Sequence, residues 1–240
     1  MDYFYNVYKE ASDHYNKKVL PSKEYRDRNT IAKEISYQKD MKSVEKSSVN
    51  ECTRLHTFRN LPREKIASMY ADVKVKPGFS EFYRQLIDDG MGKRIEFELL
   101  SVNWTSIFIH EYFEREFADS KIKVHSNELQ FDSNDLCTGT PEPNAADIRT
   151  GYDKLVEVKK LATDEFMYVG DSSADVLPMI YSDFAVIMKG GSAAKQLNRM
   201  GFHVTDISTD IIAEDDSIKF LQVDDWFDIL WILGPRFSKI

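Results

Sequence analysis

The sequence has very little cysteine and no long apolar segment. Only Cys52 and Cys137 occur in 240 residues, and their spacing matches neither a zinc site nor a disulfide framework. No uninterrupted apolar run approaches the roughly 18 residues of a membrane-spanning helix. The first residues also lack the basic and then apolar pattern of a secretory signal. We therefore expect an intracellular protein, cytoplasmic or nuclear, without a membrane partner.

The chain also lacks an excess of positive charge. It has 40 acidic and 32 basic residues, which gives a formal net charge of −8. Proteins that bind nucleic acids non-specifically neutralise phosphates with Lys and Arg. The composition therefore argues against a nucleic-acid partner, but it leaves room for a local basic pocket. With 42% hydrophobic residues, the chain can bury a substantial core.

The first 72 residues are predicted to form a helical subdomain. Phe4, Tyr8, Ala11 and Tyr15 recur at near-helical spacing within residues 2–17, which indicates an aromatic face turned toward a core. Residues 23–60 are dense in charge and are also predicted to be mostly helical, and Leu61-Pro62-Arg63-Glu64 is typical of a helix start. The charge of this subdomain does not by itself identify an interaction module, because solvation explains it equally well.

From residue 73 to residue 240, predicted strands and helices alternate. The predicted strands cover residues 94–101, 121–125, 128–131, 166–169, 184–188 and 203–204. The predicted helices cover residues 79–89, 105–117, 153–161 and 226–233, with two more after Asp175 and after Gly190-Gly191-Ser192. Gly90 and Gly92 are expected to close the first of these helices, and residues 132–150 are expected to form a loop, with a hairpin at 128–131. Such alternation predicts an α/β domain: a parallel sheet with helices on both faces.

The segment Phe166–Asp175 carries the clearest chemical signal. Its apolar run ends in Gly170, and Asp171 and Asp175 follow at positions i and i+4. Open α/β sheets bind ligands at the carboxyl ends of their strands, and two acids there could share one hard cation. The pattern favours magnesium-dependent chemistry on a phosphate. The alternative is a tight Gly-Asp turn with Asp175 solvated on the next helix.

Two further polar residues, Ser101 and Lys154, lie at the ends of predicted secondary-structure elements. Ser101 ends a strand and precedes Val102-Asn103, while Lys154 lies just inside a helix. A hydroxyl with neighbouring amides can hold phosphate oxygens, and a lysine offsets their charge. Taken alone, Ser101 could cap the next helix and Lys154 could be a solvated surface residue. The order of these residues is more informative than any one of them.

In this order the motifs resemble those of the haloacid dehalogenase-like (HAD) phosphohydrolases, and more narrowly of their phosphoserine-phosphatase-like fungal members. Leu99–Trp104 is similar to the second motif of the family, Asp153–Leu155 to the third and Gly170–Asp175 to the fourth. Val124–Leu129 also resembles a segment between the second and third motifs. The resemblance covers about residues 73–202.

The resemblance implies a fold and a set of roles. The fold would be a Rossmann-like parallel sheet (73–240) with a helical cap (1–72). The second motif and Lys154 would hold the transferring phosphoryl group. Lys154 and Asp175 would be the catalytic residues. Asp171 and Asp175 would hold magnesium. The residues implied are Ser101, Val102, Asn103, Lys154, Asp171 and Asp175.

The first motif of that family, Asp-x-Asp-x-Thr, does not occur in the sequence. Its first Asp is the nucleophile in the family, and covalent catalysis needs a positioned nucleophile. The nearest imitation, Asp27-Arg28-Asn29-Thr30, follows a polar segment and cannot end a buried strand. In the family, the strand that carries this motif lies between the strands that end here at Ser101 and Val169. The core strand itself is thus expected to be missing.

Two interpretations follow. Either the sequence starts at an internal methionine and lacks its true N-terminus, which we favour because the other motifs are intact, or it is a degenerate member. The complete form would be a magnesium-dependent phosphomonoesterase acting on a small phosphorylated metabolite, and this chain would be inactive. The alternative is a non-catalytic protein that binds a phosphate or metabolite, a regulatory pseudophosphatase.

Overall fold

The computed structural model describes residues 2–88, 95–119, 121–162, 165–207 and 218–237. Contacts divide the chain into two compact units that interleave along the sequence. Unit 1 consists of Met1–Arg26, Lys39–Lys74 and Phe97–Thr150. Unit 2 consists of Asp27–Gln38, Val75–Glu96 and Gly151–Ile240. The predicted boundary between a helical cap (1–72) and an α/β core (73–240) stays a prediction.

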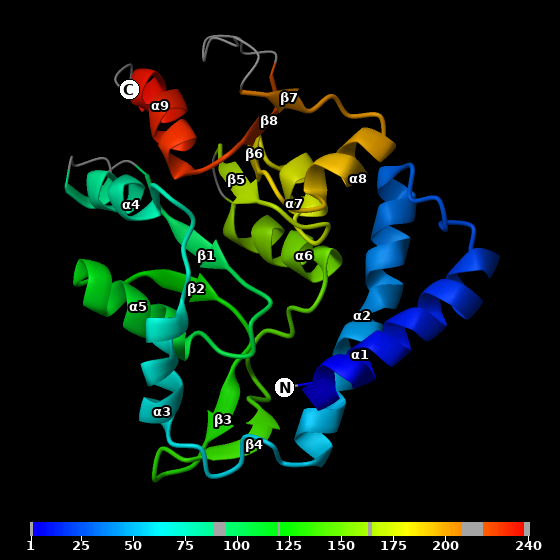
Figure 1. Ribbon diagram of the computed structural model, residues 1–240, viewed down its shortest axis with the longest axis vertical. Coiled ribbons are helices and arrows are strands. Elements are labelled where there is room, and N and C mark those ends of the chain that lie inside the picture. The colour runs from blue at the N-terminus through cyan, green and yellow to red at the C-terminus, as the bar shows by residue number, and fades with distance from the viewer. Residues whose placement is uncertain (1, 89–94, 120, 163–164, 208–217, 238–240) are drawn as a thin grey trace. The chain divides into compact units, whose positions relative to one another are not determined.

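Unit 2 is built on a four-stranded parallel sheet with the strand order β5-β6-β8-β7 (Figure 1). Its strands are β5 (Met167–Gly170), β6 (Phe184–Met188), β7 (Thr205–Asp206) and β8 (Phe220–Val223). Strand β6 has a neighbour on each side and is almost entirely buried, as its continuous apolar sequence predicts for a parallel sheet. The predicted edge strand at 203–204 lies two residues further along, as β7, and β8 was not predicted.

Helices lie on both sides of this sheet, which confirms the predicted α/β class. They are α4 (Phe79–Asp88), α6 (Gly151–Leu161), α7 (Val176–Tyr181), α8 (Ala193–Arg199) and α9 (Trp226–Phe237). Helices α7 and α8 cover one face, where Met179 and Leu197 pack against Ala185 and Ile187 of β6. Helix α9 packs against α4 and β8 on the other face, with Trp226 against the ring of Phe79 (Figure 1).

Helices dominate the N-terminal part of the chain, as predicted. Helix α1 (Asp2–His14) continues as a π-helical and a 3-10 segment to Ser22, and α2 (Ile31–Arg54) begins in unit 2 and ends in unit 1. Within unit 1, α3 (Arg63–Ala67) and a 3-10 turn (Ser68–Asp72) follow. Pro62 precedes α3 at the N-cap, in keeping with the predicted helix start. Helix α5 (Ile107–Phe117) completes the helices of unit 1 among the described residues.

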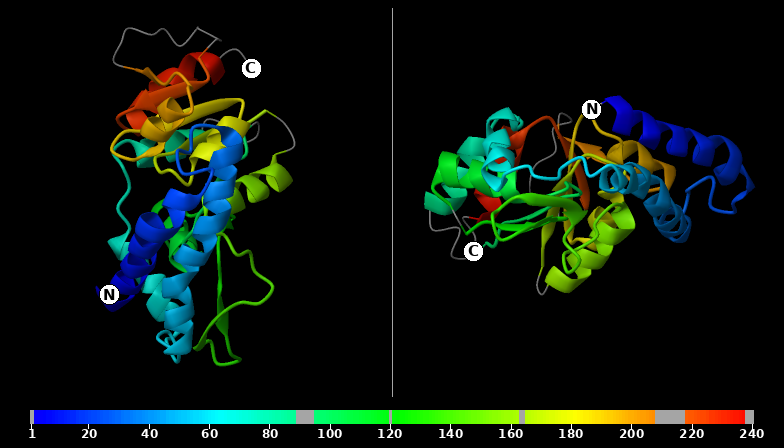
Figure 2. Two further views of the ribbon diagram at one scale, coloured as in Figure 1. Left: turned by 90° about the vertical axis from the view of Figure 1, so that its right-hand side faces the viewer. Right: turned by 90° about the horizontal axis from the view of Figure 1, so that it is seen from below.

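Unit 1 also contains a parallel strand pair and a hairpin. Strand β1 (Glu98–Leu100) pairs with β2 (Lys123–His125), while β3 (Leu129–Phe131) pairs antiparallel with β4 (Cys137–Pro141). The hairpin projects as a narrow two-stranded ribbon (Figure 2).

Strand β4 corrects the prediction that residues 132–150 form a loop. Cys137 and Gly139 face inward and alternate with threonines, a period of two that the many turn residues nearby obscured. The carboxylate of Asp132 accepts the N–H groups of Asn134 and Leu136 and so forms the turn between the strands.

Two strand edges have no partner within the described part of the chain. Strand β1 pairs only with β2, and β5 pairs only with β6. This explains why the apolar β5 is only half-buried, although its sequence is that of a fully buried strand. Strand β1 is shorter than the predicted strand 94–101, whose first residue lies outside the described residues together with Gly90 and Gly92. Of the helices described, none is both long and apolar enough to cross a membrane.

Candidate phosphate and metal site

The loop Gly170–Asp175 follows β5 at its carboxyl end and turns into α7, for which Asp175 is the N-cap residue. The carboxylate of Asp175 organises this loop. One of its oxygens accepts hydrogen bonds from Lys154 Nζ (2.7 Å) and Tyr168 Oη (3.0 Å). The other accepts them from the Ser172 hydroxyl (2.7 Å) and from the N–H groups of Asp171 and Ser172. Five donors therefore satisfy both oxygens of Asp175.

Lys154 and Asp175 form a buried ion pair. Lys154 is 8% exposed and Asp175 is 5% exposed. Burial by itself would raise the pKa of Asp175, but the charge and hydrogen bond of Lys154, together with two hydrogen bonds from Ser172, outweigh burial and lower the pKa of the carboxyl. For Tyr168, burial and then the Asp175 charge raise the pKa well above its usual value, so its hydroxyl stays a donor. The lowered pKa keeps the Asp175 carboxyl ionised at neutral pH, where it accepts the hydrogen bond from Lys154.

Glycines allow the loop to lie this close to its neighbours. A Cβ atom at Gly170 would come within 2.6 Å of the Asp175 carboxyl carbon, and one at Gly151 within 2.7 Å of the Ala174 carbonyl oxygen. At Gly191 it would lie 2.0 Å from the carbonyl oxygen of Asp171. Three segments thus meet at backbone distance, which only glycine permits.

Asp171 differs from Asp175 in its surroundings. Its side chain is exposed, and its carboxylate makes no hydrogen bond or ion pair to the described residues. Its backbone is held, because its carbonyl accepts the N–H of Ala193 (2.9 Å) at the start of α8. The loop therefore presents one free, fixed carboxylate at the carboxyl end of a parallel strand, and hard cations prefer such oxygen donors. The described residues contain no cluster of three or more side chains that would by itself hold a metal.

A second buried network within unit 2 fastens the start of α2 to this loop. Glu34 is fully buried and is bound twice by Arg28, at 2.7 and 2.8 Å, and once each by the amides of Gln38 and Gln196. The Gln38 side chain also accepts the N–H of Gly151 (2.9 Å) and donates to the carbonyl of Ser173 (3.3 Å). Gln38 therefore joins the loop to the N-terminus of α6, the helix that carries Lys154.

The other predicted phosphate-binding residues, Ser101, Val102 and Asn103, lie in unit 1, in the turn after β1. The Ser101 hydroxyl accepts the N–H of Asn103 (3.1 Å), and Val102 is exposed. Asn127, which is 1% exposed, holds this turn: its amide donates to the carbonyls of Val102, Asn103 and Ile148, and its oxygen accepts the Ile148 N–H. The turn is therefore preorganised.

Of the predicted site residues, the structure joins Lys154 and Asp175 by a hydrogen bond and places Asp171 in the same loop, and their roles stay predictions. Sequence reasoning missed Tyr168 and Ser172, which complete the donors around Asp175. The two-residue alternation of a strand could have shown that Tyr168 faces the same side as Gly170. It also missed Gln38 and Asn127, since their partners are distant in the sequence and no local pattern marks them.

Comparisons with known proteins give remote matches. No model of a known protein family matches the chain. It is 26% identical over 171 residues to Cold tolerance protein 1 of Saccharomyces cerevisiae, covering 63% of this chain and 52% of that protein. It is 22% identical over 158 residues to a CTO1 family protein of Schizosaccharomyces pombe, covering 61% of this chain and 58% of that protein. The matched part thus spans between half and three fifths of each relative.

A solved phosphoserine phosphatase, captured as an analogue of its phospho-aspartyl intermediate, resembles the chain with a TM-score of 0.49 and 14% identity. That likeness covers 85% of this chain and 90% of the other. At this level it carries no argument about the reaction.

Proposed function

We propose that the Gly170–Asp175 loop and Lys154 form the cation and phosphate side of a magnesium-dependent phosphomonoester site for a small phosphorylated metabolite. The observation that carries the proposal is the division of labour between the two acids. The carboxylate of Asp175 accepts five hydrogen bonds. The carboxylate of Asp171, four residues earlier, is exposed and has no partner in the described part of the chain. A loop built only for stability would not need to hold a bare carboxylate in a fixed place.

This geometry fits magnesium in one respect. Mg²⁺ keeps several waters and binds proteins through one or two carboxylates together with substrate phosphate oxygens, so Asp171 suits it. When bound, the ion would neutralise phosphate charge and polarise the phosphoryl oxygens. Asp175 suits a positioning role better than that of a direct ligand, because both of its oxygens are already hydrogen-bonded. It would hold Lys154 in place, and Lys154 would offset charge on the phosphoryl group.

The attacking group is not among the 240 residues in the form that the resemblance predicts. No Asp-x-Asp pair occurs in the sequence, and covalent phosphoryl transfer needs a nucleophile in line with the phosphorus. The chain as it stands is therefore proposed to bind a cation and a phosphate without turnover. Turnover of p-nitrophenyl phosphate that depends on magnesium and is abolished by Asp171→Asn would contradict this part of the proposal.

Binding of Mn²⁺, followed by electron paramagnetic resonance as a substitute for Mg²⁺, tests the cation site. Asp171→Asn should weaken it by about tenfold or more, because a ligand is lost while the fold is kept. Glu165→Gln is the matched control. Glu165 is exposed and lies in unit 2 outside the loop, so its substitution removes the same charge without touching the proposed site. Equal weakening in both variants would reveal only diffuse electrostatic attraction, and the proposed site would be lost.

A second candidate function is a non-catalytic phosphate or metabolite sensor. The absence of Asp-x-Asp favours it over an enzyme for this chain. Both candidates predict that inorganic phosphate binds in the presence of Mg²⁺. They differ in the activity expected of a longer chain, if in-frame coding sequence is found upstream of Met1. Hydrolysis by that longer chain would identify an enzyme, whereas binding without hydrolysis would identify a sensor.

A further inference from the structure

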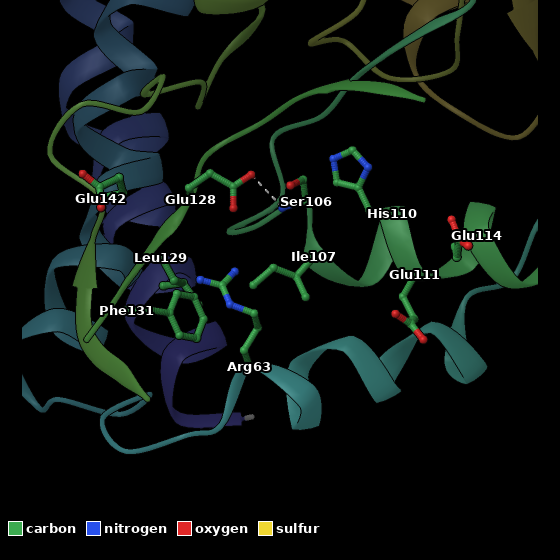
Figure 3. A pocket seen from close by; sticks show the side chains of 10 residues that line it. All are labelled: Arg63, Ser106, Ile107, His110, Glu111, Glu114, Glu128, Leu129, Phe131 and Glu142. Atoms are coloured by element: carbon green, nitrogen blue, oxygen red, sulfur yellow. Dashed lines mark hydrogen bonds between the residues drawn. The ribbon is translucent and has the colours of Figure 1, made fainter. Parts of the chain in front are cut away.

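A separate cavity of about 640 Å³ lies wholly within unit 1 and contains none of the residues discussed above as a phosphate or metal site. It opens between α3, the first turns of α5 and the β3–β4 hairpin (Figure 3). Its apolar lining consists of Ile107, Leu129 and Phe131. This volume is within the range of small-molecule sites, which combine apolar walls with a few placed polar groups.

One polar group in the lining is buried and unused. Ser106 is the N-cap residue of α5 and is only 9% exposed, yet its hydroxyl makes no capping hydrogen bond and no other bond to the described residues. Serine at an N-cap ordinarily accepts an N–H of the first turn. Here the Thr105 hydroxyl accepts the N–H of Ile107 in the first turn (3.3 Å), and the Glu128 carboxylate accepts the N–H of Ser106 itself (3.0 Å). The Ser106 hydroxyl is thus left facing the cavity (Figure 3).

Glu128 carries a charge that no cation balances in the described structure. Its partners are neutral: the Ser106 N–H, the Thr105 hydroxyl (2.9 Å) and the Ser126 hydroxyl (3.2 Å). Glu142 is half-buried on the other side of the cavity, and within the described structure its carboxylate accepts a single hydrogen bond, from the N–H of Asn144 at 3.5 Å. The cavity therefore has two carboxylates with donors but no counter-charge.

The remaining charged residues do not change this balance. Arg63 is the cation of the lining, but its Nε is bound to Asp135 (3.0 Å) and its guanidinium stacks on Phe131. Glu111 is paired with Arg115 (2.6 Å). Glu114 is exposed and has no partner among the described residues, and it adds a third unbalanced carboxylate. The complement of this lining is a positive charge.

The carboxylates of the lining come from different parts of unit 1: Glu114 lies on α5, Glu128 precedes β3 and Glu142 follows β4. Among the described residues they do not form a cluster of three or more side chains that would hold a metal ion. Spread acidic groups over an apolar lining suit a ligand with separated ammonium groups joined by carbon. We propose that this cavity binds a small aliphatic diamine. One ammonium group would lie at Glu128 and Ser106, and the other toward Glu142 (Figure 3).

Isothermal titration of the full chain with 1,4-diaminobutane tests the proposal, with 1,4-butanediol as the uncharged ligand control. Glu142→Gln should weaken binding about tenfold, since a charge-assisted hydrogen bond is lost. Ser106→Ala should weaken it about fivefold without changing the unfolding midpoint, because the hydroxyl has no hydrogen-bond partner among the described residues. Glu116→Gln is the matched control, because Glu116 is an exposed acid on α5 that does not belong to the cavity lining.

Saturable diamine binding that is reduced by Glu142→Gln and Ser106→Ala, and kept by Glu116→Gln, would support the site. Three results would overturn it: no heat at millimolar diamine, equal weakening in all three variants, or equal binding of the diol. Competition by Mg²⁺ at equal concentration would also overturn it, because the cavity would then select charge alone. Native circular dichroism of each variant guards against a loss of fold as the cause.

Discussion

At the scale of single residues, the two acids of the Gly170–Asp175 loop have different physical roles despite their common residue type. Asp175 is buried and fully hydrogen-bonded, and Asp171 is exposed. A buried charge requires both a partner and hydrogen bonds to offset its lost hydration. Lys154 is that partner, so either charge without the other would be left unbalanced in the interior.

Asp175→Asn is therefore expected to destabilise the protein by about 3 kcal/mol at pH 7, because it leaves Lys154 buried without a counter-charge. Urea unfolding followed by circular dichroism measures the change. Glu157→Gln, in the more exposed Glu157–Lys160 pair, is the control and should stay within about 0.5 kcal/mol. The double variant Lys154→Met/Asp175→Asn should recover part of the loss, since no charge then remains buried and the side-chain oxygen of the new amide still accepts hydrogen bonds.

The same carboxyl sets an acid dependence. Its pKa in the folded protein lies below the value of about 3.9 for an unfolded Asp, so the folded state binds this proton less readily. The stability it contributes is present above about pH 4 and is lost as the pH falls through the folded pKa. The stability gap between the wild type and Asp175→Asn should therefore narrow below pH 4. A gap that is constant from pH 7 to pH 3 would show that charge is not the cause.

At the scale of elements, the site depends on how closely helices approach one loop. The N-terminus of α6 touches the loop at Gly151, the start of α8 touches it at Gly191, and α2 reaches it through Gln38. Short backbone distances and a shared side-chain amide make these contacts direct. Displacement of α6 by a fraction of an ångström would move Lys154 relative to Asp175.

Gly151→Ala tests this arrangement. In most helices alanine is more stable than glycine by up to about 1 kcal/mol. Here the new methyl group would lie 2.7 Å from the Ala174 carbonyl oxygen, so we expect a loss of about 1–3 kcal/mol, measured by urea unfolding. Lys160→Ala, at an exposed position of the same helix, should change stability by no more than about 0.5 kcal/mol. A stabilising Gly151→Ala would mean that α6 does not bear on the loop.

At the scale of the whole molecule, the acidic balance of the sequence limits its partners. With a net charge of −8, the surface repels a polyanion unless a basic patch overcomes the total. Of the cations discussed above, Lys154 and Arg63 are each bound to an Asp, and Arg28 and Arg115 are each bound to a Glu.

We accordingly expect no saturable binding of a short labelled DNA or RNA duplex at about 0.15 M salt, as measured by fluorescence anisotropy. Bovine albumin serves as an acidic protein control. Binding that saturates at micromolar protein and weakens steeply with added salt would contradict the expectation and would reveal a basic surface that the total charge conceals.

Much of the fold follows from local patterns. The continuous apolar run of β6, the glycines before α8 and the alternation from residue 73 onward predicted the parallel sheet with its helices. Other features do not leave such a pattern. Strand β4 was missed because turn residues surround it, and β8 was missed although it is as long as β5.

The sequence by itself determined the residue types and spacing of the candidate site: a glycine and two acids after an apolar run, and a lysine that opens a helix. Only the tertiary structure decided how the acids differ. Burial and five donors commit Asp175 to Lys154, and Asp171 stays exposed. The physical reason is that burial and part of the hydrogen bonding depend on other elements, such as α6, which brings Lys154 to Asp175 from 21 residues away, whereas periodicity records only each element's own faces.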